Sequence, residues 1–180
     1  DLLAQLLRGQ EMTSVLVFTR TKHYASRLAL TLERRGVKVS VLHGDRSQSQ
    51  RLRALEQFRR GRSQVMVATD IAARGIDIED ISHVINFDVP NSPDDYVHRI
   101  GRTARADATG DAFTLVDRDE EPMIKEIEQR LNRTLPRVTL PNFDYKRGAP
   151  PRGPDHRPHR GGGDHGHGRA HGGGPHRRGR

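Results

Sequence analysis

The sequence predicts an α/β fold with a mostly parallel sheet, and two patterns in residues 1–145 support that prediction. Short apolar segments of strand length recur along this region, the first being SVLVF at 14–18. Segments with helical spacing of apolar residues lie between them, the first being TKHYASRLALTLERRG at 21–36. Strands that alternate with helices of about 10 to 15 residues form βαβ units, whose strands run parallel.

The first helix is indicated by one apolar face and by a stop signal. Ala25, Leu28, Ala29 and Leu32 recur at the spacing of a single helix face. Gly36 stands where a left-handed residue commonly ends a helix. The β-branched segment VKVSVLHG at 37–44 then predicts the second strand.

The second helix, at 47–61, has both a start signal and an apolar stripe. Ser47 and Gln50 have the spacing of a capping box. We expect Leu52, Leu55 and Phe58 to face the core, and the glycine at 61 to end the helix. Further strands are expected at 64–68, 83–87 and 111–116, and a last helix at 120–131.

Polar segments follow three of the expected strands. They are FTRTK at 18–22, LHGDR at 42–46 and ATDIAARGID at 68–77. In parallel sheets, ligands bind beyond the carboxyl ends of the strands. We therefore expect these three segments to crowd onto one edge of the sheet.

Residues 146–180 differ from the rest in charge and composition. The net charge is +8, and this tail carries nine Lys/Arg and two Asp, against 22 Lys/Arg and 21 Asp/Glu in residues 1–145. The tail has almost no apolar side chains to offset the entropy of ordering, so we expect one domain at 1–145 and a disordered tail at 146–180. Its cations favour a polyanion, most simply nucleic acid, although a solubilising linker is the plainer reading.

Composition also excludes several classes of protein. The absence of cysteine excludes a disulfide scaffold and suits a reducing compartment. No apolar run approaches the roughly 20 residues of a membrane span, and no signal peptide opens the chain. We expect a cytoplasmic protein without membrane contact.

Six histidines in the glycine-rich tail predict adventitious metal binding rather than a functional metal site, which would need fixed geometry.

The segment VATDIAARGID at 67–77 is a candidate binding loop. The Thr69 hydroxyl suits a phosphate, Gly75 permits close approach of the backbone, and Asp77 suits a sugar hydroxyl. The alternative is an ordinary strand-to-helix turn with Thr69 or Asp70 as the N-cap.

The segment HRIGRTAR at 98–105 is a candidate phosphate site. Arg99, Arg102 and Arg105 are three residues apart and should point roughly the same way, so an anionic partner is expected. Arg102 and Arg105 lie one helical turn apart, close enough for both to reach one phosphate. The alternative is a solvated basic face, which Gly101 and the following threonine disfavour.

The segment LHGDRSQSQR at 42–51 leads into a helix N-terminus, whose free N–H groups attract phosphate. Gly44 stands at the strand end, and Arg46, Gln48 and Arg51 line the entrance. The plainer reading is a βα loop with its capping box.

The chain contains no GxxxxGK[ST] phosphate loop and no Asp-Glu-Ala-Asp carboxylates. Arginines without a phosphate cradle suggest a finger that reaches a phosphate held by another domain.

Together and in this order, these segments resemble the second RecA-like domain of DEAD-box RNA helicases. VLVFTRTK matches motif IV of that family, HGDRSQSQR the next block, VATDIAARGID motif V and YVHRIGRTARA motif VI. Bacterial RhlE-type members look closest. The resemblance covers roughly residues 1–145 and implies a three-layer RecA-like domain of the P-loop NTPase type.

The resemblance also implies roles on the nucleotide side of such a domain. Arg102 and Arg105 would contact the γ-phosphate, with Phe18 packed behind the motif VI arginines. Gly75 and Asp77 would bind ATP, Asp77 through the ribose. His98 would couple the nucleotide to the facing domain.

For the RNA-binding side of the domain, the resemblance implies a second set of residues. Those that would hold the RNA backbone are Gly44, Gln48, Arg51, Thr69 and Arg74. ATP and Mg²⁺ would be held mainly by the first RecA-like domain of the same enzyme. We therefore expect this chain alone neither to hydrolyse ATP nor to unwind RNA. A non-catalytic RNA-binding or regulatory module and a motor domain of a DNA helicase remain alternatives.

Overall fold

The computed structural model describes residues 1–9, 12–76, 78, 81–103 and 110–145. Asp77, Arg105 and the tail at 146–180 lie outside the described residues, so the expectations for them stay predictions. The described residues belong to one compact unit, Asp1–Tyr145.

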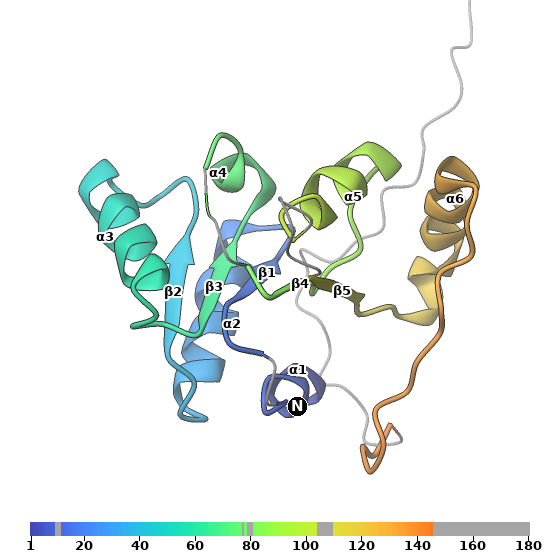
Figure 1. Ribbon diagram of the computed structural model, residues 1–180, viewed down its shortest axis with the longest axis horizontal. Coiled ribbons are helices and arrows are strands. Elements are labelled where there is room, and N and C mark those ends of the chain that lie inside the picture. The colour runs from blue at the N-terminus through green and yellow to red at the C-terminus, as the bar shows by residue number, and fades with distance from the viewer. Residues whose placement is uncertain (10–11, 77, 79–80, 104–109, 146–180) are drawn as a thin grey trace, which may run out of the picture. The chain divides into compact units, whose positions relative to one another are not determined.

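The described residues form one five-stranded sheet (Figure 1). Its strands are β1 (Val15–Phe18), β2 (Val39–Leu42), β3 (Val65–Ala68), β4 (His83–Asn86) and β5 (Asp111–Thr114). Their order is β2-β3-β1-β4-β5, and every neighbouring pair is parallel. The predicted α/β class with a mostly parallel sheet is confirmed.

Six α-helices accompany the sheet in the described part of the chain. They are α1 (Leu2–Leu6), α2 (Lys22–Glu33), α3 (Gln48–Arg59), α4 (Asp70–Ala73), α5 (Pro93–Ile100) and α6 (Glu121–Leu131), with a short 3-10 turn, η1 (Arg118–Glu120), before the last. The sequence patterns predicted α2, α3 and α6. They gave no helix at α1 or at the eight-residue α5, and α4 only as the alternative strand-to-helix turn, because elements this short leave little periodic signal.

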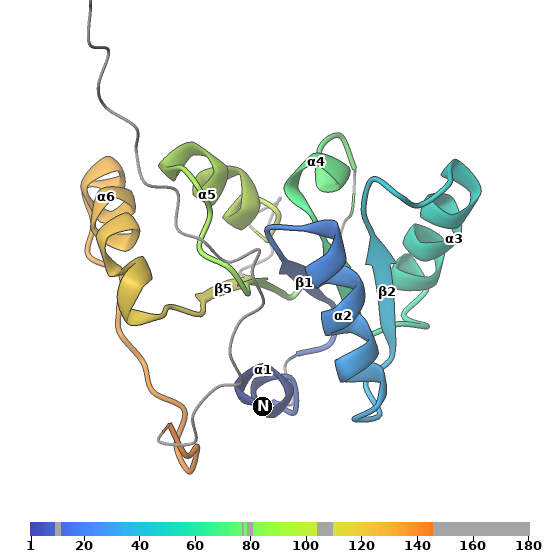
Figure 2. The same ribbon diagram turned by 180° about the vertical axis from the view of Figure 1, so that it is seen from behind.

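Alternating side chains of the strands divide the core into two halves. Figure 2 shows α2 on the near side of the sheet. Val15 and Val17 of β1 pack with α1 and α2, whereas Leu16 and Phe18 pack with α3 and α4. This alternation follows from the pleat of a strand, which sends successive side chains to opposite faces. A third cluster, centred on Tyr96, Ile124 and Ile127, joins α5 to α6. The layered arrangement agrees with the expected three-layer fold.

The ends of α2 and α3 agree with the signals in the sequence. The Thr21 hydroxyl accepts from the backbone N–H of Tyr24 at 3.2 Å, which caps α2. Gly36 has a φ of 83°, the left-handed conformation expected of a residue that ends a helix. Ser47 and Gln50 form the predicted capping box at the start of α3.

The predicted apolar stripe of α3 was wrong at one position. Leu52 is 58% exposed, whereas Phe58 is 3% exposed and Ala54 is also buried. At 3.6 residues per turn, Leu52 lies about 120° around the helix from Phe58, too far to share its face. Ala54 lies only about 40° from Phe58, so the smaller residue takes the core position.

Two leucines of α2 provide a matched test of this core. Leu32→Ala should lower the free energy of unfolding by about 3 kcal/mol, because Leu32 is 2% exposed and its removal leaves a cavity. Leu30→Ala, on the outer face of the same helix, should change it by less than about 0.5 kcal/mol. Urea unfolding followed by circular dichroism measures both. Equal losses would contradict the assignment of the α2 face.

Candidate functional site

The carboxyl ends of β1, β2 and β3 meet at one edge of the sheet. Phe18 and Leu42 each stand in register with Ala68. The backbone N–H of Thr19 donates to the carbonyl of Ala68 at 2.9 Å, and that of Thr69 donates to the carbonyl of Leu42 at 3.2 Å. The three polar segments that follow these strands therefore leave the sheet at one level, as predicted.

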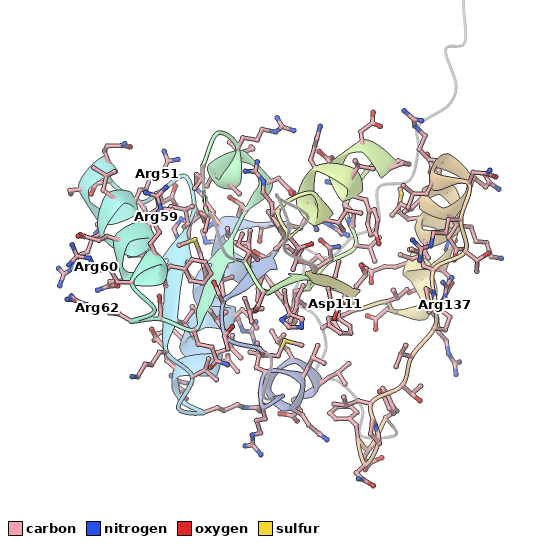
Figure 3. The ribbon with its side chains drawn as sticks, viewed as in Figure 1. Arg51, Arg59, Arg60, Arg62, Asp111 and Arg137 are labelled. Atoms are coloured by element: carbon pink, nitrogen blue, oxygen red, sulfur yellow. The ribbon has the colours of Figure 1, made fainter. Side chains whose placement is uncertain are left out.

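The entrance to α3 presents Gly44 and Gln48 to solvent, while Arg51 has a partner. Both of the former residues are exposed. Arg51 lies on α3 (Figure 3). Its guanidinium donates through Nη2 to the carbonyl of Ala72 at 3.3 Å. Arg51 therefore joins α3 to the C-terminal end of α4, as well as lying where the resemblance places an RNA contact.

The loop after β3 shows which of the two candidate residues, Thr69 or Asp70, occupies the N-cap position of α4. Thr69 occupies the N-cap position of α4, yet in the described part of the chain its side chain makes no capping hydrogen bond. Asp70 is not the cap, because it is the first helical residue and its carboxylate accepts from Arg99. Gly75 is exposed with a φ of 72°, a conformation that other residues adopt only with strain.

Arg99 has an internal anion, which corrects the expectation that it points the same way as Arg102. Its Nε and Nη2 donate to the two carboxylate oxygens of Asp70 at 2.6 and 2.8 Å. Its Nη1 donates to Asn86 Oδ1 at 3.1 Å and to the carbonyl of Asp88 at 2.9 Å. Arg99 is 2% exposed and lies over the Phe18 ring, 5.1 Å from its centroid. It therefore does not share an outward face with Arg102.

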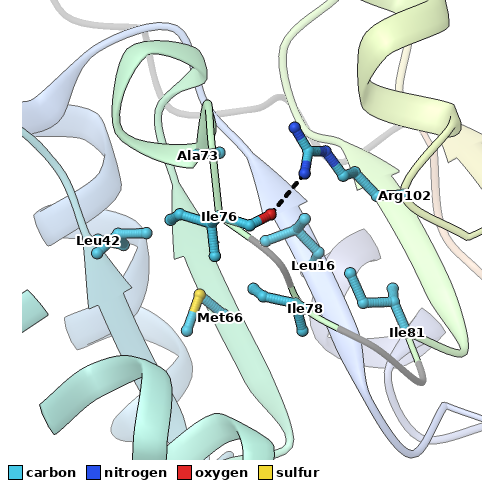
Figure 4. A pocket seen from close by; sticks show the side chains of 8 residues that line it. All are labelled: Leu16, Leu42, Met66, Ala73, Ile76, Ile78, Ile81 and Arg102. Carbon is cyan, nitrogen blue, oxygen red and sulfur yellow. Dashed lines mark hydrogen bonds between the residues drawn. The ribbon is translucent and has the colours of Figure 1, made fainter. Parts of the chain in front are cut away.

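Arg102 lies beyond the end of α5, in the turn after Gly101. Its Nη1 donates to the carbonyl of Ile76 at 2.6 Å, next to Gly75 (Figure 4). Its stem contacts an apolar cavity lined partly by Leu16 and Ile78. The fold thus brings a motif VI arginine to the motif V loop. Because Arg105 lies outside the described residues, the joint reach of the two arginines to one phosphate stays a prediction.

Two further predicted residues lie on the same side of the sheet. Arg74, at the end of α4, is exposed and pairs with Asp95 of α5 at 3.4 Å. His98 is exposed in the last turn of α5. Contacts from Arg51, Arg74, Arg99 and Arg102 thus connect α3, α4 and α5, together with the loop that carries Gly75, into one structure.

Sequence reasoning missed the acceptors that surround Arg99. Asp70 lies 29 residues from Arg99 in the chain, and no local pattern pairs them. Asn86 offered one signal, since an amide inside the apolar segment HVINF is a polar group that must find partners when buried. Its partners, Arg99 of α5 and Thr114 of β5, are known only from the folded structure.

His43 precedes Gly44 and is buried against α2. Its Nε2 lies 2.9 Å from the Ser26 hydroxyl, and its Nδ1 accepts from the backbone N–H of Asp45 at 3.3 Å. Burial and the positive charge of Arg46 lower the pKa of His43 below its ordinary value of 6.5, and the Asp45 carboxylate opposes them. The loop that carries Gly44 therefore rests on a neutral imidazole.

Within the described ranges, no group of three or more His, Cys, Asp or Glu side chains is arranged to hold a metal ion. None of the described helices is long and apolar enough to span a bilayer.

A parallel α/β domain whose motif V and motif VI segments meet at the carboxyl edge of its sheet has the form of a RecA-like motor domain. Residues 1–107 match the model of the helicase conserved C-terminal domain, and the chain belongs to this family, in its DEAD-box form. The structure of Escherichia coli DEAD-box protein SrmB, solved with regulator of ribonuclease activity A, is similar with a TM-score of 0.78 and 39% identity. That match covers 84% of this chain and 89% of the SrmB chain.

Curated relatives agree with the DEAD-box assignment but not with the expected subgroup. The DEAD-box ATP-dependent RNA helicase CshA of Bacillus subtilis is 46% identical over 144 residues, which are 80% of this chain and 29% of CshA. ATP-dependent RNA helicase DeaD of Buchnera aphidicola is 39% identical over 145 residues, 81% of this chain and 24% of DeaD. These names do not support an RhlE-type member. The chain spans less than a third of the length of these two relatives.

The buried Arg99–Asp70 pair should be a main source of stability at the site. Arg99→Ala should lower the free energy of unfolding by about 3 kcal/mol, because Asp70 and Asn86 lose their buried donor. Arg60→Ala, which removes an exposed pair with Glu56, should change it by less than about 0.5 kcal/mol. Urea unfolding provides both values. A loss as small for Arg99 as for Arg60 would refute the role.

Stability should fall in acid because of His43. Its folded pKa lies below 6.5, so the unfolded chain takes up the proton first, and the folded state loses stability as the pH falls below about 6.5. His43→Gln should flatten the dependence of unfolding free energy on pH between 7.5 and 5.5, and the control His98→Gln, an exposed histidine that does not act on the pKa of His43, should not. The charged groups near His43 are Arg46, Asp45, Lys22 and His23. An unchanged slope in His43→Gln would exclude His43 as the cause.

Proposed function

We propose that this chain is the second motor domain of an ATP-dependent RNA helicase. The contact of Arg102 with the backbone of Ile76 is the observation that favours it most, because this contact puts a candidate finger at the candidate nucleotide loop. Relatives named ATP-dependent RNA helicases support the proposal, as does the similar structure of S. cerevisiae Dbp5 bound to RNA and ADP BeF3, with a TM-score of 0.66 and 38% identity. The activity of a whole helicase, and its place in the cytoplasm, are part of the proposal.

On the nucleotide side, the chain would contribute groups that sense and stabilise phosphate charge. Arg102 and Arg105 would donate to the γ-phosphate, where a guanidinium offsets the charge that develops during transfer. Gly75 fits a nucleotide loop, since a Cβ built on it meets nothing within 4 Å and its φ of 72° disfavours any side chain. Asp77 would accept from the ribose, and His98 would face the other domain. When bound, ATP supplies the phosphoanhydride bond that is hydrolysed, and the first RecA-like domain would hold most of ATP and Mg²⁺.

On the RNA side, the chain would hold the sugar–phosphate backbone. Thr69, whose hydroxyl is not used for capping in the described residues, would donate to a phosphate. Gln48 and the open backbone at Gly44 lie at the start of α3, where helix N–H groups favour an anion. Arg51 and Arg74 would add positive charge. Because such contacts go to the backbone, binding would depend little on base sequence.

A non-catalytic RNA-binding module is the main alternative, and a motor domain of a DNA helicase is another. The position of Arg102 favours the motor, because a module that only binds RNA needs no cation beside Gly75. The exposed side chains at the α3 entrance fit either polymer, so RNA or DNA must be decided by assay.

A fusion to the first RecA-like domain of a relative such as CshA tests the finger role. The fusion should hydrolyse ATP when RNA is added, and the 180-residue chain alone should not. Arg102→Ala in the fusion should lower kcat on the order of 10³-fold, since it removes charge stabilisation in the transition state. Steady-state phosphate release with RNA or DNA measures these effects.

Arg62→Ala, in the loop after α3, is the matched control and should leave kcat unchanged (Figure 3). RNA affinity of the Arg102→Ala fusion should stay within about twofold, because the finger acts on the nucleotide. Full activity without Arg102 would exclude the finger, and stimulation by DNA alone would favour the DNA-helicase alternative. ATP hydrolysis by the isolated chain would contradict the need for a second domain.

A further inference from the structure

The strand β2 is an edge of the sheet, and its outer side has hydrogen-bonding groups to offer. β2 pairs with β3 through alternate residues: the carbonyl of Lys38 accepts from Val65 at 3.1 Å, and that of Leu42 accepts from Thr69 at 3.2 Å. The N–H and C=O groups of Val39 and Val41 therefore point away from β3. Among the described residues, none of these four groups has a hydrogen-bond partner.

A groove of about 220 Å³ runs along this edge. The groove is lined by residues 39–41 of β2, by residues in and just before α3, which are called the α3 wall below, and by Glu33 at the end of α2. Arg46, from the loop before α3, and Arg53 and Gln57, from α3 itself, belong to this wall. The Nε of Arg46 is buried and, in the part of the chain that the structure describes, has no hydrogen-bond partner. The groove thus combines a free sheet edge with two cations.

We propose that this groove binds an extended acidic peptide of a partner protein, which adds to β2 as a sixth strand. The peptide backbone would pair with the outward groups of Val39 and Val41, as strands do when they extend a sheet. Every second side chain would face the α3 wall, where carboxylates would pair with Arg46 and Arg53. The side chains between them would face Glu33, which disfavours an acid there.

The chemistry of the groove disfavours other occupants. Phosphate groups of RNA only accept hydrogen bonds, so an RNA phosphate backbone cannot pair with the carbonyls of Val39 and Val41 as the N–H groups of a peptide backbone do. A second copy paired through β2 would bring Arg46 and Arg53 against the same arginines. The tail at 146–180 is itself strongly basic and would be repelled. The remaining alternative is that β2 is simply a short edge strand, which the nearby charged side chains protect from aggregation. In that case β2 would bind no peptide.

Titration of the 180-residue chain with a fluorescein-labelled peptide, TEVEVEVT, tests the proposal by anisotropy. The peptide should bind saturably, and Arg46→Glu with Arg53→Glu should weaken it at least about tenfold. The peptide TKVKVKVT, in which lysine replaces each glutamate, should bind that double variant at least about tenfold more tightly than it binds the unmodified chain. Arg60→Glu with Arg62→Glu makes the same change in net charge just after α3, outside the groove, and should alter affinity less than about twofold (Figure 3).

Amide exchange on the unmodified chain tests the strand pairing without relying on a variant that folds. Saturating TEVEVEVT should protect the amides of Val39 and Val41, and methylation of alternate peptide nitrogens should weaken binding at least about tenfold. The proposal is overturned if no binding is seen, if both double variants lose affinity equally, or if these amides stay unprotected. Protection of the same amides by a uridine dodecamer, and not by the peptide, would assign the groove to RNA instead.

Discussion

The site depends above all on the buried pair of Arg99 and Asp70. A guanidinium that is 2% exposed is stable only when its donors are paired, and here Asp70, Asn86 and the carbonyl of Asp88 accept from all three of its nitrogens. These acceptors come from α4, β4 and the segment that follows β4, so one side chain of α5 fixes three parts of the domain. The guanidinium also lies over the ring of Phe18, so the same side chain contacts β1 as well. Gly75 follows directly on α4, and Arg102 follows α5, so their approach is set by this pair.

The sequence predicted what depends on neighbours in the chain. The strands, the faces of α2 and the capping box at Ser47 are local patterns, and the structure confirms them. Leu52 was misplaced because apolar residues three apart drift around a helix, and only the packed structure decides which of them is buried. Arg99 was misread for a different reason. Its spacing from Arg102 suggested a shared face, but its partner Asp70 is distant in the chain, and Arg102 lies beyond the helix end.

The candidate site and the β2 groove place different demands on arginine. At the carboxyl edge, Arg51 and Arg102 each donate to a backbone carbonyl, so their positions are fixed by the fold before any ligand binds. In the groove, Arg46 has a buried Nε without a partner among the described residues, and Arg53 is exposed. A cation whose position the fold fixes suits a reaction that needs exact geometry, and a cation with donors that the fold leaves unused suits the binding of an external carboxylate.

The one-turn helix α4 is held from both sides, by Arg51 at its carboxyl end and by Arg99 at its first residue. In the proposed function, RNA would engage the Arg51 side, and the nucleotide would engage the loop that follows α4. A ligand that shifts α4 from one side must then change the affinity for the other, and thermodynamic linkage makes that effect equal in both directions. So short a helix has little packing of its own to resist such a movement. A movement of α4 would therefore couple the binding of the two ligands.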